Sequence, residues 1–426
     1  MTRPQDSGQV DTLGRSGLRI AMALYGDVTH DSRVQREAET LCQAGHVVTI
    51  YCLSGTVASS SPFQVVAKRP RWSSVLPDGS SPFLRSGPSR RLGGLASRVQ
   101  WVIGYARNIR AWGRWAVNAA GEVDVWHAHD LTGLMAVGPH IPRNARLVYD
   151  SHEIFLETGT ADRLPRPLRE LLSMYEWFLA QRAAALVTVN EGYARVLRRR
   201  IRPRRVVIVR NCPPRWTPPA PPAHPLREAA NVDATSPLVL YHGAFAPHRG
   251  IEQAADALRE PGLERAHLAL LGFGGARDDL LALAREAPFT GRVHVLDAVP
   301  PGELLEWITG ADVDVIALQH STLNHWLCTP NKLWESLAAG VPVVVSDFPI
   351  MRRVVLEAPD GPLGAVCDPA NPASIAEAIR ALIERSPAER QATRARCLRA
   401  AHHRWNWETE ASRLVSLYEG LSGRDA

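Results

Sequence analysis

Residues 18–53 carry the pattern from which the fold follows: LRIAMALYGDVTHDSRVQREAETLCQAGHVVTIYCL. An apolar run at 18–24 is followed by an amphipathic segment that ends at Gly45, and then by a second apolar run at 46–53. The two runs predict strands, and a glycine directly after a periodic segment is a typical helix end. Because neither run alternates apolar and polar residues, we expect a parallel α/β sheet that helices cover on both faces.

The same succession of apolar runs and helical segments continues along the chain. Further strands are predicted at 123–128, 145–149, 185–189 and 206–209, and a second series at 238–241, 267–271, 293–296, 313–318 and 341–345. Between the two series, residues 212–225 hold seven prolines, which neither a helix interior nor a central strand accommodates. The sequence therefore predicts two doubly wound α/β domains joined by a linker.

The predicted domain boundaries follow this break. We expect a disordered tail at 1–17, a first domain at 18–211, a proline-rich linker at 212–235 and a second domain at 236–404. Ligands of such folds bind at the carboxyl ends of the strands. Two domains that face each other would place both sets of strand ends on one cleft.

Composition restricts the class of protein. The formal net charge is +6, which favours anionic partners, but the basic residues accompany no recognised nucleic-acid motif, so we predict no nucleic-acid partner. The N-terminus is polar, and no window approaches the roughly 18–20 apolar residues of a membrane span. The six cysteines are scattered, which favours reduced thiols over a metal site. These features predict a cytoplasmic protein.

Two motifs in the second half suggest phosphate binding. In residues 241–250, YHGAFAPHRG, Gly243 permits a close approach of the backbone to a ligand, and Arg249 precedes a helix. In residues 329–340, TPNKLWESLAAG, Lys332 and Glu335 are three residues apart and share one helix face. The alternatives are an ordinary βα turn with a surface arginine and an exposed ion pair on a capped helix.

Polar residues also follow the predicted strands of the first half. His127, His129 and Asp130 end the segment VDVWHAHD, and His152 and Glu153 follow the next strand in YDSHE. A His-x-His pair with acids nearby resembles a metal site, but no third ligand follows at helical spacing, and we predict no metal. After the first strand, Asp31 is expected to cap the first helix, and Arg33 to point into the cleft.

In this order, the motifs resemble those of the family 4 retaining glycosyltransferases, which have the GT-B fold of two Rossmann-like domains. The resemblance runs from about residue 18 to 418, and its most specific piece is PNKLWESLAAGVPVVVSD at 330–347. It implies transfer of a sugar from a nucleotide-diphosphate sugar to an acceptor, with retention of configuration and without a metal or other cofactor. It also implies that the last helix, at about 405–426, returns to the first domain.

The resemblance assigns roles to residues of this sequence. Arg249 and Lys332 would bind the diphosphate, Glu335 the ribose, and His129 the transferred sugar. The remaining residues expected on the donor side are Gly243, Gly272, Gly274, Val299, Asn331 and Leu333. Those expected on the acceptor or sugar side are Asp31, Arg33, Asp130, His152, Glu153, Asn324 and His325. Asp312 and Asp314 form the Asp-x-Asp of another glycosyltransferase architecture, but they begin a buried strand, and we interpret them as structural.

Two departures from the family pattern affect the prediction. Ala244 stands where many members have an arginine, and Leu327 stands where many have a second glutamate, which Asn324 or His325 would replace. The alternatives to transfer are therefore a catalytically silent relative that binds sugar nucleotides and a sugar-nucleotide epimerase of the same fold. The donor base, the sugar and the acceptor stay open; a polysaccharide, a lipid-linked saccharide and a natural product are all candidates.

A basic segment at 85–118 suggests a membrane contact. At helical spacing, Trp101, Tyr105, Trp112 and Trp115 share one face, and Arg107, Arg110 and Arg114 lie on the other. Such segregation is typical of a helix in a membrane interface, and we hypothesise peripheral docking on an anionic membrane. The alternatives are that the aromatic face packs on the first domain beside solvated arginines, or that buried aromatics accompany arginines that touch lipid.

Overall fold

The computed structural model describes residues 17–29, 31–70, 94–158, 161, 164–220 and 224–422, with the backbone alone at 94–103. The tail predicted at 1–17 lies outside this part, apart from residue 17, and so does His30. The described chain forms two compact units. The first comprises 17–70, 94–148 and 415–422, and the second comprises 149–220 and 224–414.

The first sheet has seven strands in the order β3-β2-β1-β4-β5-β6-β7. Its strands are β1 (Arg19–Asp27), β2 (Val47–Ser54), β3 (Gln64–Ala67), β4 (Val125–His129), β5 (Arg146–Ser151), β6 (Ala183–Thr188) and β7 (Val206–Ile208). β1 pairs in parallel with β2 and β4, as the apolar runs predicted. The central strands are buried along most of their length, β4 at every residue, because helices cover both faces.

The second sheet has six parallel strands in the order β10-β9-β8-β11-β12-β13. They are β8 (Leu238–Ala244), β9 (His267–Phe273), β10 (Val293–Asp297), β11 (Val313–Ile316), β12 (Val343–Ser346) and β13 (Gly364–Cys367). Successive side chains of β8 enter opposite cores: Val239 and Tyr241 pack on one face, and Leu238 and Leu240 on the other. This strand is therefore buried on both faces.

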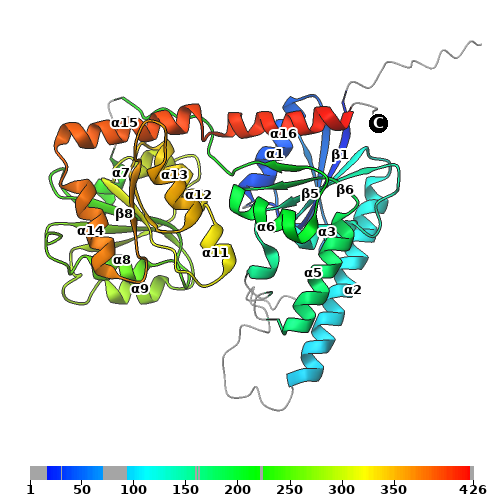
Figure 1. Cartoon of the computed structure of the whole chain (residues 1–426), viewed down its shortest axis with the longest axis horizontal. Helices are drawn as coiled ribbons and strands as arrows, with labels where there is room; N and C mark the ends of the chain where they lie inside the picture. The colour runs from blue at the N-terminus through cyan, green and yellow to red at the C-terminus, as the bar shows by residue number, and fades with distance from the viewer. Residues whose placement is uncertain are drawn as a thin grey trace, which may run out of the picture. The chain divides into compact units, whose positions relative to one another are not determined.

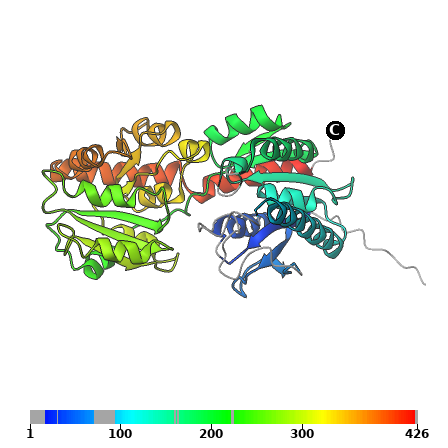
Figure 2. The ribbon, with the colours of Figure 1, turned by 90° about the horizontal axis from the view of Figure 1, so that it is seen from below.

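Helices flank both sheets (Figures 1 and 2). In the first half they are α1 (Ser32–Gln43), α2 (Gly94–Ala120), α3 (Asp130–Val137), α5 (Arg166–Ala180) and α6 (Glu191–Ile201), with a 3-10 turn, η2, at Phe155–Glu157. Next come α7 (Pro225–Ala230), α8 (Ile251–Ala257), α9 (Arg277–Leu283), α10 (Leu304–Ile308), α11 (Leu323–Leu327) and α12 (Asn331–Ala338). The last are α13 (Pro349–Leu356), α14 (Pro372–Ile383), α15 (Pro387–His403) and α16 (Trp407–Ser422). None of the helices in the described part is long and apolar enough to cross a membrane.

The last helix returns to the first sheet, as the family resemblance implied. The hydroxyl of Tyr418 in α16 lies 2.8 Å from Nδ1 of His127 in β4. Closer to its start, Glu410 accepts a hydrogen bond from the guanidinium of Arg210, which follows β7, at 3.1 Å. The described part of the proline-rich stretch, 212–220, contains neither helix nor strand. The exact domain boundaries stay a prediction.

Candidate functional site

Glycines shape the carboxyl ends of β8 and β9. Gly243 has a positive φ of 112°, a conformation that L side chains rarely adopt. A Cβ atom on Gly272 would lie only 1.9 Å from the carbonyl oxygen of Gly243, so no other residue fits there without movement of the backbone. Gly274 also has a positive φ, and a Cβ there would meet the carbonyl of Phe245 at 2.4 Å. The three predicted glycines therefore lie together at one edge of the second sheet.

The turn from β8 into α8 positions Arg249. Gly250 has a φ of 73°, and a Cβ on it would lie 1.9 Å from the carbonyl oxygen of Ala317. This glycine lets the turn pack closely against the end of the neighbouring strand β11. Arg249 is partly buried beside it, and its charge contributes to the lowered pKa of Lys332. The two predicted phosphate-binding cations are therefore close enough to repel each other.

Lys332 lies in the first turn of α12, with Nζ 3.6 Å from the centre of the Tyr241 ring. Burial lowers the pKa of Lys332, and Arg249 lowers it further, whereas Asp314 and Glu335 raise it; the result is a pKa of about 8. The aromatic face stabilises the ammonium partly, as cation–π contacts do. A partly desolvated ammonium beside a second cation is well suited to bind an anion, which would relieve the repulsion.

His242 of β8 contacts both β11 and α12. Its role was not predicted from the sequence. Its Nε2 atom lies 3.1 Å from Oε2 of Glu335, and its Nδ1 atom lies 3.5 Å from Oδ2 of Asp314. Burial lowers the pKa of His242, but the charges and hydrogen bonds of Asp314 and Glu335 outweigh that effect and raise the pKa to about 9. The imidazole is therefore positively charged at neutral pH. Ser336 completes the arrangement by donating a 2.6 Å hydrogen bond to Asp314.

The two aspartates of the Asp-x-Asp segment have protein partners. Asp312 accepts hydrogen bonds from Arg227 at 2.6 Å and from the backbone N–H of Leu238 at 2.9 Å. Asp314 is fully buried below His242 and Ser336. These contacts support the structural interpretation, although Asp314 also holds the charged imidazole under the site.

The other residues predicted on the donor side differ in accessibility. Glu335 is partly exposed, with 23% of its side chain accessible, and Asn331 is exposed at the start of α12. Val299 packs against the edge of the core and stays partly accessible. The side chain of Leu333 does not line the donor side. It is fully buried in the core of the second sheet, because it points to the opposite face of α12. Its backbone N–H is bonded to the carbonyl of Pro330.

Helix α11 contains the two residues predicted to replace the missing glutamate. Asn324 is almost fully buried: its side-chain oxygen accepts a hydrogen bond from the N–H of Ile154, and its carbonyl accepts one from the hydroxyl of Tyr193. These bonds fasten α11 to Ile154 and Tyr193 and engage the side-chain oxygen of Asn324, whose contact with the sugar stays a prediction. His325 is partly buried, and its pKa is lowered mainly by burial and then by the charge of Arg249. Its proximity to Arg249 keeps it at the candidate site.

The acidic segment after β5 also has defined positions. His152 lies 2.8 Å from the fully buried carboxylate of Asp150, so the imidazole orientation is fixed by that pair. Glu153 is exposed, and its charge helps to raise the pKa of Tyr193 on α6. Both predicted residues therefore lie in the second unit with Arg249 and Lys332.

In the first unit, a buried cluster forms around β4. His129 is fully buried and stacks on His127, with ring centres 4.5 Å apart. Glu37 of α1 lies 3.6 Å from His127, and Arg33 pairs with Glu37 at 2.9 Å. Arg33 is therefore a core residue of this unit, and the prediction that it points into a cleft is wrong. Sequence spacing gave no sign of Glu37, because it is 90 residues from His127.

Two helix starts in the first unit have specific backbone chemistry. Asp31 caps α1, because its side chain accepts a hydrogen bond from the N–H of Val34 at 3.1 Å; the predicted capping role is confirmed. Asp130, directly after His129, has a φ of 55°, a left-handed conformation that costs a residue other than glycine about 1–2 kcal/mol. Such strain is found mainly at functional sites.

Helix α2 presents its aromatic face to its own unit. The ring of Trp112 contacts Tyr25 with centroids 5.4 Å apart, and its indole N–H donates to the carbonyl of Lys68. Trp115 packs on Tyr51, and Tyr105 packs on Tyr25. These contacts favour the alternative in which the aromatic face packs on the first domain, whereas the side chain of Trp101 lies outside the described part. The arginines expected on the other face, Arg107, Arg110 and Arg114, are exposed.

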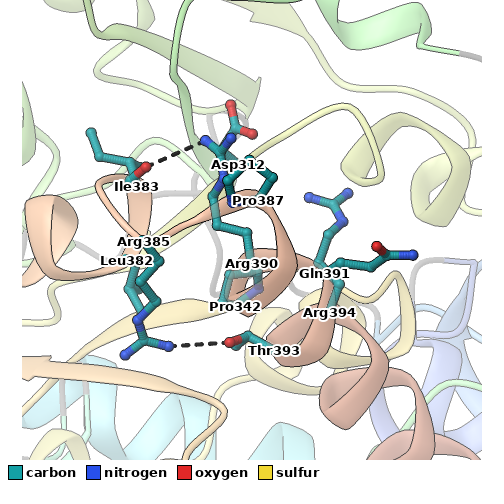
Figure 3. Close-up of a pocket in the computed structure, with 10 residues that line it drawn as sticks. All are labelled: Asp312, Pro342, Leu382, Ile383, Arg385, Pro387, Arg390, Gln391, Thr393 and Arg394. Carbon is teal, nitrogen blue, oxygen red and sulfur yellow. Dashed lines mark hydrogen bonds between the residues drawn. The ribbon is translucent and has the colours of Figure 1, made fainter.

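A separate cavity of about 230 Å³ lies at the opposite, amino end of the second sheet (Figure 3). Three of its lining residues are arginines, and each is already bonded to the protein. Arg385 donates to Thr393, Arg390 to the carbonyl of Ile383, and Arg394 to the carbonyl of Ala311. These arginines join α14 and α15 to the sheet, and the cavity is distinct from the residues at the carboxyl ends of the strands.

Known proteins match both halves of the chain. A family model described as Glycosyl transferase 4-like domain matches residues 30–212, and one described as Glycosyl transferases group 1 matches residues 224–402. Glycogen synthase of Mycobacterium tuberculosis (strain CDC 1551 / Oshkosh) is 29% identical over 199 residues, which are 45% of this chain and 44% of that protein. The chain thus matches less than half the length of that relative.

Solved structures share the arrangement of both sheets. Sucrose-phosphate synthase from Thermosynechococcus elongatus has a TM-score of 0.71 at 17% identity, covering 95% of this chain and 99% of that one. Anabaena HepE in complex with UDP and glucose has a TM-score of 0.66 at 16% identity, covering 95% and 100%. At these identities the likeness shows the fold.

Two parallel sheets, each covered by helices, together with these matches define a glycosyltransferase of the GT-B type. The two family models account for most of the chain between residues 30 and 402. The protein belongs to the family 4 glycosyltransferases.

Proposed function

We propose that this glycosyltransferase takes its sugar from a nucleotide-diphosphate donor held at the carboxyl ends of the second sheet. The observation that supports this most is the grouping of Arg249, Lys332 and Glu335 around the glycine-lined end of β8. A Cβ placed on Gly243 would lie 3.6 Å from Nζ of Lys332, so backbone and ammonium border the same space. Two cations and a flexible backbone edge match the needs of a diphosphate.

In this proposal, the cations act mainly on the leaving group. Negative charge grows on the diphosphate as the glycosidic bond breaks, and fixed positive groups stabilise it without reorganisation. Tyr241 positions the ammonium of Lys332 before a ligand arrives, and the close packing at Gly250 fixes the backbone beside Arg249, so little ordering of these groups is needed on binding. A bound diphosphate would also return the pKa of Lys332 toward its ordinary value.

Glu335 is proposed to accept hydrogen bonds from ribose hydroxyls. His242 donates to one of its oxygens or shares a proton with it at 3.1 Å, and this contact fixes the carboxylate while part of it stays accessible. The contact with the imidazole fixes the orientation of the carboxylate, and charge-assisted hydrogen bonds to a carboxylate are stronger than those between neutral groups. His242 and Asp314 are thus positioning residues that act through Glu335.

A solved structure of similar fold supports the proposal that the donor contains a nucleoside diphosphate. Anabaena HepE, whose structure this chain resembles, holds UDP and glucose. We propose a nucleoside diphosphate as the shared ligand and leave the base and the sugar open. Retention of configuration and independence of metal are proposed on the family resemblance, with His129 as the residue that contacts the transferred sugar.

The acceptor and location are proposed more broadly. All six cysteines are free thiols, which supports a reducing compartment such as the cytoplasm. The acceptor would be a growing polysaccharide, a lipid-linked saccharide or a natural product. Of the hypothesis for residues 85–118, the arginine face of α2 is the part that we retain as a contact with anionic lipid.

A panel of nucleotide sugars tests the proposed function. Mass spectrometry of products, with and without added acceptors, is expected to show loss of one donor and appearance of its nucleoside diphosphate. An active transferase with no acceptor should still hydrolyse its donor slowly. Binding without any turnover would favour the silent relative, and a changed donor sugar with no released nucleotide would favour the epimerase.

A further inference from the structure

Helix α5 has large apolar side chains on the face that points away from the sheet. Leu171, Met174, Trp177 and Phe178 are 59%, 64%, 44% and 63% exposed. Spacings of three, four and seven residues place Leu171, Met174 and Phe178 on one side of the helix, and its buried residues, such as Leu179, lie on the other. A helix on the surface of a globular protein normally has the reverse pattern.

Helix α6 carries arginines in the same kind of row. Arg195, Arg198 and Arg199 are all exposed, and their spacing of three and four residues puts them on one face. Arg202, also exposed, follows the end of α6 in a left-handed conformation with a φ of 52°. The opposite face of α6 is buried and includes Leu197. In the part of the chain that the structure describes, no carboxylate forms an ion pair with any of these four arginines.

The two rows belong to one surface. Helices α5 and α6 pack against each other and follow β5 and β6, which with β7 form three neighbouring strands of the first sheet (Figure 1). Successive right-handed crossovers in one direction put both helices on the same face of a sheet. The outward sides of α5 and α6 therefore form a continuous α5–α6 face, made by the four apolar residues of α5, the three arginines of α6 and the adjoining Arg202.

The segment that contains this face carries more net positive charge than the whole chain. Residues 166–205 contain ten arginines and three glutamates, a net charge of +7, against +6 for the entire chain. The neighbouring carboxylates are already engaged, since Glu170 pairs with Arg166, and Glu157 with Arg169 and Arg200. The row of arginines on α6 thus lacks compensation beside an exposed apolar strip.

We propose that the α5–α6 face docks on a bilayer that contains anionic lipids. The apolar row would enter the boundary between headgroups and acyl chains, and the arginines would contact lipid phosphates at the level of the headgroups. A second copy of the chain fits less well, because two such faces would bring like charges together. The inference goes beyond sugar transfer and stands whether or not the donor-site assignment is correct.

Sedimentation with vesicles tests the proposal on the full-length protein. One vesicle set contains phosphatidylcholine alone, and the other contains equal parts of phosphatidylcholine and phosphatidylglycerol. The wild type is expected to bind the second set about tenfold or more tightly than the first, and to lose part of this binding at high salt. Absence of binding to anionic vesicles at low salt would overturn the proposal.

Two variants separate the apolar and the charged contributions. Met174→Gln with Phe178→Gln should remove the binding that persists at high salt, and Arg195→Glu with Arg199→Glu should remove the part of the salt-sensitive binding that the α2 arginines do not supply. All four positions are exposed, so thermal unfolding should stay near that of the wild type. If the apolar pair fails to fold, Leu171→Gln alone replaces it.

The matched control reverses three charges elsewhere: Arg107→Glu, Arg110→Glu and Arg114→Glu on α2. The proposal requires that this triple variant keep the apolar, salt-resistant part of the binding. Loss of all binding in the triple variant, with normal binding in the α5 and α6 variants, would assign docking to α2 instead. Light scattering without lipid measures the oligomeric state. A dimer that Phe178→Gln dissociates would show that a second copy of the chain covers this face, and would overturn the proposal.

Discussion

The imidazole of His242 lies 3.1 Å from the carboxylate of Glu335, although the two residues are 93 positions apart. On its other side, the same ring lies 3.5 Å from Asp314. The histidine between two carboxylates links the end of β8 to α12. The contact with His242 thus holds one oxygen of Glu335 in position, and the accessible part of the carboxylate stays available for a ligand.

Removal of either proposed phosphate contact should reduce turnover strongly. Arg249→Ala and Lys332→Ala each remove a charge-assisted hydrogen bond worth about 1.5–3 kcal/mol, so kcat/KM should fall roughly 10- to 150-fold. Arg399→Ala is the matched control, because it removes an exposed arginine of α15 that pairs with Asp360 at the surface. Its kcat/KM should be near that of the wild type. Near-normal activity in both site variants, with normal thermal unfolding, would refute the donor site.

Glu335→Gln should weaken binding of the free nucleoside diphosphate, because an amide accepts hydroxyl hydrogen bonds less well than a carboxylate. Isothermal calorimetry measures the dissociation constant directly. Glu377→Gln, the same change at an exposed position of α14, is the matched control and should leave the affinity unchanged. Equal affinity in the wild type and Glu335→Gln would mean that Glu335 serves only to hold His242.

Nucleotide affinity should fall as pH rises above about 8. Lys332 has a pKa of about 8 in the free protein, so the fraction that carries a proton decreases above that value, while the bound diphosphate requires the protonated form. One coupled proton lowers the affinity by at most about tenfold per pH unit. Calorimetry of Lys332→Arg between pH 7 and 10 is the control, since arginine stays charged. Any pH dependence of affinity that remains in Lys332→Arg is assigned to His242. Equal pH dependence in the wild type and in Lys332→Arg would contradict the assignment of the titrating group to Lys332.

His242 should stabilise the fold in a defined pH window. Its pKa is raised from 6.5 to about 9, so its contribution is fully present below pH 6.5 and is lost as pH rises through about 9. The difference in the free energy of unfolding between the wild type and His242→Asn should therefore shrink across that window, by at most about 1.4 kcal/mol per pH unit. His403→Asn, at an exposed position, should show no such trend. A difference that grows with pH would show that the imidazole is neutral in the folded protein.

His129→Ala should reduce transfer more than it reduces nucleotide binding, because its proposed contact is the sugar. Comparison of turnover with the dissociation constant of the nucleoside diphosphate separates the two. EDTA should leave activity unchanged. A loss that manganese restores would point to Glu37, His127 and His129, whose ligand atoms lie within 4.8 Å of one another, since Asp312 and Asp314 are already bonded to the protein.

Local chemistry made much of this protein predictable from its sequence. Unbroken apolar runs predicted the described strands of both sheets except the edge strands β3 and β13, because a strand buried on both faces needs apolar residues throughout. The aspartate at 31 was identified as a helix cap, and Gly243 as a point of close backbone approach, because each depends on neighbours in the chain or on backbone geometry. These features require no knowledge of distant residues.

Contacts between distant segments could be decided only by the tertiary structure. The sequence did not reveal that Asn324 is bonded to Ile154, 170 residues away, or that Arg33 is paired inside a core. Nor did it distinguish the buried aromatic face of α2 from the exposed apolar face of α5, since periodicity shows that a helix has an apolar face but not which neighbour covers it. Which polar group meets which is determined by how strands and helices pack, and at these positions local sequence is compatible with several partners.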